Sequence, residues 1–67
     1  MYGQRLKELR MEKGLTQTEL AKVLNTTQKS ISKYENEYLD VSTETIIKIC
    51  KYFDVSADYL LGLESEL

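Results

Sequence analysis

The side chains best suited to chemistry lie on a short polar segment between residues 28 and 36. Its strongly apolar side chains, Ile31 and Tyr34, are three residues apart, so one side of a helix would face inward. The other side would present Gln28, Lys29, Ser32 and Lys33. Glutamine can pair with adenine through two hydrogen bonds, lysine can donate to guanine O6 and N7, and a helix fits the major groove of B-form DNA. The segment is therefore suited to reading base edges.

These polar residues have a simpler interpretation, because many surface helices present a solvated polar face. Taken one at a time, Gln28, Lys29 and Lys33 are better explained that way. The case for DNA contact depends on the elements around them, which must hold the segment by its apolar side.

The residues before this segment predict a second helix and a tight turn. Thr16 and Glu19 have the spacing of a capping box. Asn25 tolerates the left-handed conformation that ends a helix, and Thr27 is a natural N-cap for the polar segment. The apolar residues of the earlier helix are Leu20, Ala21 and Leu24. Free amides at the two helix N-termini, near Gln17 and Thr27, could bind phosphates.

Three further helices are predicted around this pair. Residues 4–13 place Leu6, Leu9 and Arg10 on one face and end at Gly14. Ser42 caps a helix with an amphipathic stripe of Ile46, Ile49, Cys50 and Phe53, while Ile47 falls off the stripe.

Ser56 caps the last predicted helix, which ends at Gly62. In it, Leu60 and Leu61 are expected in the core, and Leu63 is left open between the core and a dimer contact. We expect one all-α domain over residues 1–67, compact and five-helical, with a frayed tail at 62–67.

The composition excludes several classes of protein. The chain of 67 residues has one cysteine and no histidine, so we expect no disulfide framework, no metal site, no cofactor and no histidine-based catalysis. Cys50 is expected to be a small core residue. No apolar run reaches the roughly 20 residues of a membrane span, and no secretion signal is evident, so a cytoplasmic location is expected.

The charge is divided unevenly along the chain. Residues 1–34 carry seven basic and three acidic side chains, a net charge of +4, whereas residues 35–67 carry two basic and eight acidic ones, a net charge of −6. Local charge matters more than the total of −2 for attracting a polyanion. The predicted helix pair lies in the positive half.

Four separated motifs, in order and with matching spacing, resemble one family. They are Leu6-x-x-Leu9-Arg10; Gly14-Leu15-Thr16-Gln17-x-Glu19-Leu20-Ala21; Thr27-Gln28-x-Ser30-Ile31-Ser32-x-Tyr34-Glu35-Asn36; and Val55-Ser56-x-Asp58-Tyr59-Leu60-Leu61-Gly62. The chain is similar over nearly its whole length to the Cro/C1-type helix-turn-helix domains, also called the XRE family, which are phage-repressor-like DNA-binding domains. The resemblance implies a five-helix lambda-repressor-like fold in which helices 2 and 3 form the helix-turn-helix.

The resemblance also implies roles for individual residues. It implies that Gln28, Lys29 and Lys33, with Ser32 as a further candidate, lie near base edges, and that Gln17 and Thr27 lie near phosphates. Arg10 would pair with Glu35 across helices 1 and 3.

The segment after the third helix is less clear. Asn36 is a candidate phosphate contact, and Tyr38 either touches the DNA backbone or is a plain surface residue. Where the family commonly has glycine at two turns and proline before helix 4, this chain has Asn25, Glu37 and Val41. Residues 37–40 are acidic where related loops are often basic.

We therefore expect a sequence-specific regulator of transcription that binds double-stranded DNA, most simply a repressor acting as a homodimer on a palindromic operator. A small-molecule ligand is not expected within the domain. One alternative is a protein-interaction module of the same fold that has lost DNA binding, which the acidic net charge favours. An enzyme has almost no support.

Overall fold

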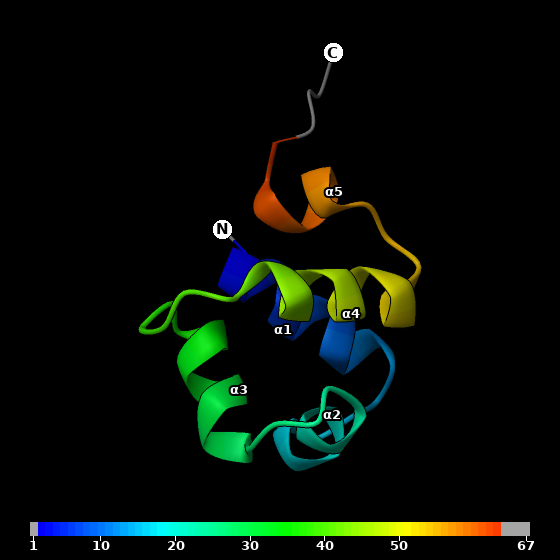
Figure 1. The fold of residues 1–67 in the computed structure, drawn as a ribbon. Coiled ribbons are helices and arrows are strands. Elements are labelled where there is room, and N and C mark those ends of the chain that lie inside the picture. Colours follow the sequence, from blue (N-terminus) through cyan, green and yellow to red (C-terminus); the bar gives the residue numbers. More distant parts are fainter. Residues whose placement is uncertain (1, 64–67) are drawn as a thin grey trace.

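The computed structural model describes residues 2–63, which form five α-helices without a strand in that range (Figure 1). The helices are α1 (Tyr2–Glu12), α2 (Gln17–Val23), α3 (Gln28–Glu35), α4 (Thr43–Phe53) and α5 (Ala57–Leu61). The predicted all-α class is confirmed. None of the helices within residues 2–63 is both long and apolar enough to cross a membrane.

All four predicted N-caps are confirmed. In each case a side-chain oxygen accepts a hydrogen bond from the backbone N–H three residues later, and the capping residues are Thr16, Thr27, Ser42 and Ser56. At α2 the capping box is complete, because the Glu19 carboxylate also accepts the Thr16 backbone N–H at 2.8 Å. These bonds satisfy amides that have no partner within the helix.

Each of the five helices is followed by one residue in the left-handed conformation. Gly14, Asn25 and Gly62 were expected to end helices, and the structure gives them φ values of 70°, 56° and 74°. Glu37 and Asp54 adopt the same conformation, with φ values of 59° and 57°, although neither was expected to be left-handed. A non-glycine side chain is disfavoured in this region, so these two positions carry backbone strain.

The boundaries of two predicted helices need correction. The first helix spans Tyr2–Glu12 rather than residues 4–13. The second ends at Val23, because Leu24 is its C-cap residue, whereas the third ends at Glu35 as expected. Of the tail predicted at 62–67, residues 64–67 lie outside the described residues.

Each helix contributes one fully buried large side chain to a single core. These side chains are Leu6, Leu20, Ile31, Ile49 and Leu60. Tyr34 and Cys50 are half-buried against them, and Ile47 is exposed as the off-stripe position predicts. Leu61 was expected in the core but is only half-buried, and Leu63 is exposed.

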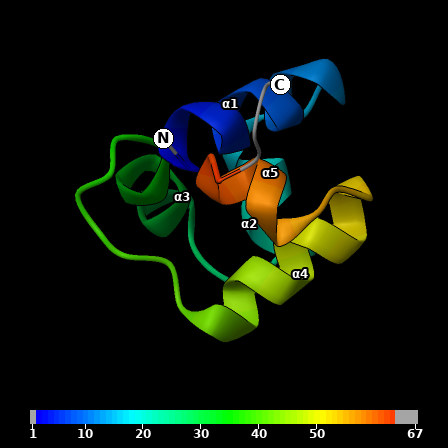
Figure 2. The same ribbon diagram turned by 90° about the horizontal axis from the view of Figure 1, so that it is seen from above.

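The first helix is tied to three other helices. Its N-terminal turn packs on the end of α3 through the buried Gly3. Arg5 lies over the Tyr59 ring at 4.6 Å, and Lys13 lies over the Tyr52 ring at 4.9 Å, which links α1 to α5 and α4. Lys13 is exposed, and this cation–π contact gives its ammonium group a partner on α4. Figure 2 shows α1 running beside both α3 and α5.

Candidate nucleic-acid interface

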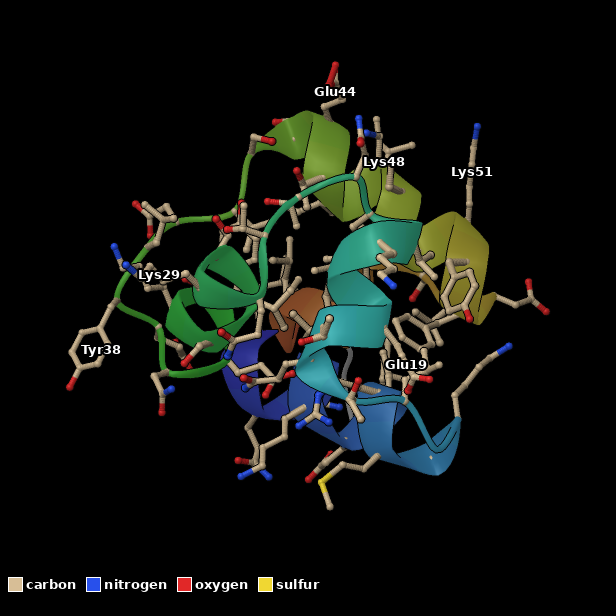
Figure 3. All side chains as sticks on the ribbon, turned by 90° about the horizontal axis from the view of Figure 1, so that it is seen from below. Glu19, Lys29, Tyr38, Glu44, Lys48 and Lys51 are labelled. Atoms are coloured by element: carbon tan, nitrogen blue, oxygen red, sulfur yellow. The ribbon has the colours of Figure 1, made fainter. Side chains whose placement is uncertain are left out.

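The second and third helices form a helix-turn-helix whose inner side is anchored in the core. Leu20 and Ala21 of α2, Leu24 in the turn and Ile31 of α3 are all buried. Figure 3 looks onto this face of the molecule, with α2 and α3 in front. The apolar residues of α3 hold it from behind, so its polar residues are free to face solvent.

Those polar residues include the four predicted base contacts. Gln28, Lys29 and Lys33 are exposed, whereas Ser32 is half-buried. The structure therefore brings a neutral amide and two ammonium groups onto the open side of one helix. Lys29 extends away from α3 into solvent (Figure 3).

Arg10 and Glu35, the expected ion pair, join α1 to the end of α3. The guanidinium Nε lies 2.6 Å from one carboxylate oxygen of Glu35, and Nη2 lies 3.2 Å from the other. The side chains are 12% and 3% exposed. The third guanidinium nitrogen donates to the Leu15 carbonyl oxygen at 2.8 Å. A planar guanidinium matched to a carboxylate in this way fixes the orientation of both groups.

Two glutamine side chains extend this ion pair to the surface. Gln17, the first residue of α2, donates from Nε2 to Glu35 Oε1 at 3.1 Å. Gln28, the first residue of α3, donates from Nε2 to Gln17 Oε1 at 2.7 Å. A continuous polar chain thus runs from α1 through α3 and α2 to the start of α3.

The sequence reasoning missed this chain of amides. It named Gln17 and Gln28 separately, one for a phosphate and one for a base. The sequence does contain a signal for this pairing, because each glutamine is the first residue after a threonine N-cap. The N-termini of the two helices are adjacent, and this brings the two side chains together.

The remaining predicted phosphate contacts differ in their exposure and in whether their side chains already make hydrogen bonds within the domain. The Thr27 hydroxyl accepts the Ser30 N–H and donates to the Ser30 hydroxyl, both at 3.1 Å. Asn36 donates its amide N–H to the Ser32 carbonyl oxygen at 2.8 Å. Tyr38 is 84% exposed and points away from the body of the domain (Figure 3).

The acidic loop after α3 folds its charges toward α1. Glu37 packs against Gly3 at the start of α1, where the positive end of the helix dipole favours a carboxylate. The Tyr2 hydroxyl donates to the Leu39 carbonyl oxygen at 2.8 Å. Burial raises the pKa of the Tyr2 phenol, and the negative charges of Asp40 and Glu37 raise it further. These two carboxylates therefore lie close to the N-terminal turn of α1.

Cys50 does not contribute to this surface. It is half-buried against the core, and burial raises the pKa of its thiol, which is the behaviour of a small packing residue rather than a reactive one. Within residues 2–63, no three metal-binding side chains are grouped to hold an ion.

The domain has five helices, a helix-turn-helix whose inner side is buried in the core, and a third helix with a polar outer side. These features define the class of the phage-repressor-like DNA-binding domains. A helix-turn-helix family model matches residues 6–60. The chain belongs to this helix-turn-helix family, of the XRE or Cro/C1 type, as the sequence motifs predicted.

Curated relatives are transcriptional regulators and an antitoxin. The regulator ImmR of Bacillus subtilis is 47% identical over 60 residues, covering 90% of this chain and 47% of that protein. The antitoxin PezA of Streptococcus pneumoniae is 40% identical over 67 residues, covering 100% of this chain and 42% of that protein. The chain thus spans about half the length of these relatives.

Solved structures confirm the lambda-repressor-like fold. The P22 c2 repressor, in complex with a synthetic operator, matches with a TM-score of 0.88 and 25% identity over 96% of this chain and 97% of that one. The biofilm regulator SinR, in complex with DNA, matches with a TM-score of 0.81 and 34% identity over 91% of this chain and 98% of that one. The chain is a DNA-binding helix-turn-helix domain of the transcription-regulator class and not an enzyme.

Proposed function

We propose that this chain is the reading domain of a cytoplasmic repressor that binds a palindromic operator as a homodimer. The observation that carries the proposal is α3 itself, whose Ile31 is fully buried while Gln28, Lys29 and Lys33 remain exposed. The operator and DNA complexes of similar proteins support it. A dimer would place two such helices about 34–36 Å apart, one turn of DNA.

The contacts divide into two groups. Gln28, Lys29, Ser32 and Lys33 would reach base edges and carry specificity. Gln17, Thr27, Asn36 and Tyr38 would reach phosphates and fix the register. Gln17 can do so because its amide has a second N–H besides the one given to Glu35.

The charge around the helix pair favours a polyanion despite the acidic total. Glu19 is used in the α2 cap, and Glu35 is paired with Arg10. Lys22, Lys29 and Lys33 are exposed on the same two helices. Repression would follow from occupying DNA that polymerase needs.

Selection of bound duplexes from a random pool tests the proposal. We expect inverted repeats with half-site centres about 10–10.5 base pairs apart. Binding of the selected duplex should weaken with salt, with a log–log slope of about −0.9 per phosphate contacted. Asymmetric single sites would contradict the homodimer on a palindrome. Failure to bind any duplex at low salt would favour the protein-interaction module instead.

A further inference from the structure

The hydrogen bonds that link Glu35, Gln17 and Gln28 have a fixed direction. The Glu35 carboxylate is paired with the Arg10 guanidinium and can only accept hydrogen bonds. Gln17 must therefore turn an N–H toward Glu35, and its carbonyl oxygen is left facing Gln28. Gln28 must in turn donate an N–H to that oxygen. The carboxylate thus decides which way both amides point.

This direction determines what Gln28 presents to a ligand. A glutamine amide has two N–H donors and one carbonyl oxygen. Because one N–H is used by Gln17, an N–H and the oxygen remain. Adenine offers the matching acceptor and donor at N7 and N6, whereas guanine offers two acceptors, N7 and O6. If Gln28 faced guanine, its carbonyl oxygen would lie against a lone pair of guanine N7 or O6, which is repulsive.

We propose that Glu35 is a specificity-determining residue that acts through Gln17 and makes Gln28 favour adenine over guanine. The inference rests on the proposed function, because it requires Gln28 to face a base. Glu35 does not itself reach DNA, since its side chain is 3% exposed. It is a positioning residue whose effect is transmitted by two hydrogen bonds of 3.1 and 2.7 Å.

The substitution Glu35→Gln removes the constraint with little change of shape. A glutamine here keeps one oxygen for the Arg10 Nε and can place an N–H where Oε1 now accepts from Gln17. The 3.2 Å bond that Oε1 also accepts from Arg10 Nη2 is then lost. Gln17 can then reverse its amide, accept that N–H and donate to the Gln28 oxygen. Gln28 would present two N–H groups, which match guanine O6 and N7.

The experiment measures Kd for paired duplexes that differ at one base pair. The position is first located as the one where Gln28→Ala loses discrimination. For the unaltered chain we expect the A·T duplex to bind about tenfold more tightly than the G·C duplex. In Glu35→Gln that ratio should fall to about one or reverse. Gln17→Leu should also reduce it, because Gln28 is then free to turn, and Glu35→Gln should add nothing in that background.

The matched control is Arg10→Lys, which weakens the ion pair but leaves Glu35 a carboxylate. It should lower the unfolding temperature while keeping the A·T preference. A Glu35→Gln variant that folds, by circular dichroism, yet retains the original ratio would overturn the inference. If that variant does not fold, an unchanged ratio in Gln17→Leu would overturn it equally. An unaltered chain that binds no duplex would overturn both the proposed function and this inference.

Discussion

Gly3 in the first turn of α1 lies directly against the backbone of Glu35 at the end of α3. A Cβ atom at residue 3 would be 2.5 Å from the Glu35 carbonyl oxygen and 2.7 Å from that of Tyr34. Neither oxygen belongs to a flexible side chain that could move aside. The absence of a side chain at Gly3 therefore allows the end of α3 to pack closely against the start of α1.

Gly3→Ala should destabilise the domain by about 1–3 kcal/mol, the usual effect of overpacking a close contact. Alanine in a helix ordinarily stabilises by about 0.5–1 kcal/mol relative to glycine, so a loss of stability would show that the steric contact outweighs helix propensity. Urea unfolding measures the change in the free energy of unfolding. Lys7→Ala, at an exposed position of the same helix, is the control and should stay within about 0.5 kcal/mol. A Gly3→Ala variant as stable as the parent would show that α3 can shift enough to accommodate the added methyl group.

Arg10→Leu should lower the free energy of unfolding by about 3 kcal/mol, because it leaves the buried Glu35 carboxylate without its cation. Thermal and urea unfolding measure the loss. Replacing both residues with leucine should recover much of it, since no unpaired charge then remains. An unchanged melting temperature in Arg10→Leu would mean that the pair contributes nothing to stability.

Asp54→Gly should stabilise the domain by roughly 0.5–1 kcal/mol. Asp54 is exposed and has a φ of 57°, a conformation that glycine adopts without a steric penalty. Asp54→Ala should destabilise by a similar amount, because alanine lacks the local hydrogen bonding that lets aspartate tolerate this region. Equal stabilities for the two variants, measured by urea unfolding, would argue against strain at this turn.

Stability should fall in alkaline solution, in part through Tyr2. Its pKa is raised in the fold by burial and by Asp40 and Glu37, so the fold favours the neutral phenol. The stabilisation is present below the unfolded pKa of about 10 and is lost as pH rises through the folded pKa. Tyr2→Phe should show a smaller drop above pH about 10 than the parent. Tyr59→Phe is the control, and identical pH profiles for the parent and Tyr2→Phe would contradict the assignment.

Lys33→Ala should weaken binding of the selected duplex and relax discrimination at particular base pairs by about 1–3 kcal/mol, because it removes a side chain proposed to contact a base. Tyr38→Phe, which removes the hydroxyl proposed to contact a phosphate, should weaken binding to all duplexes alike. Competition binding with a panel of single-base variants separates the two effects. If Lys33→Ala and Gln28→Ala both bind every duplex as the parent does, α3 is not the reading helix.

Local signals in the sequence predicted much of the fold. The four threonine and serine caps are read directly from residue type and spacing, and so is the left-handed turn at Asn25. The left-handed conformation of Glu37 and Asp54 was not predicted, because neither residue is the glycine or asparagine that usually marks such a turn. The hydrogen bond from the Tyr2 hydroxyl to Leu39, a residue 37 positions away, was likewise not predicted, because no local pattern specifies it.

The candidate site was predicted residue by residue but not as a connected unit. Exposure of Gln28, Lys29 and Lys33 follows from the apolar positions of Ile31 and Tyr34 on the same helix. The bond between Gln17 and Gln28 depends on how two helices are placed relative to each other, which the pattern within either helix does not specify. The contact of Lys13 with Tyr52 escaped prediction for the same reason.

The bond between the two glutamines limits how a new target preference can arise. Gln28, the side chain proposed to contact a base, lies on α3, but the amide that accepts its hydrogen bond belongs to Gln17 of α2. Replacing α3 with that of a relative would therefore change residue 28 but leave Gln17, its hydrogen-bond partner on α2, unchanged. Positions 17 and 28 should change together, in evolution as in engineering, and a library that randomises α3 alone would explore a restricted set of specificities.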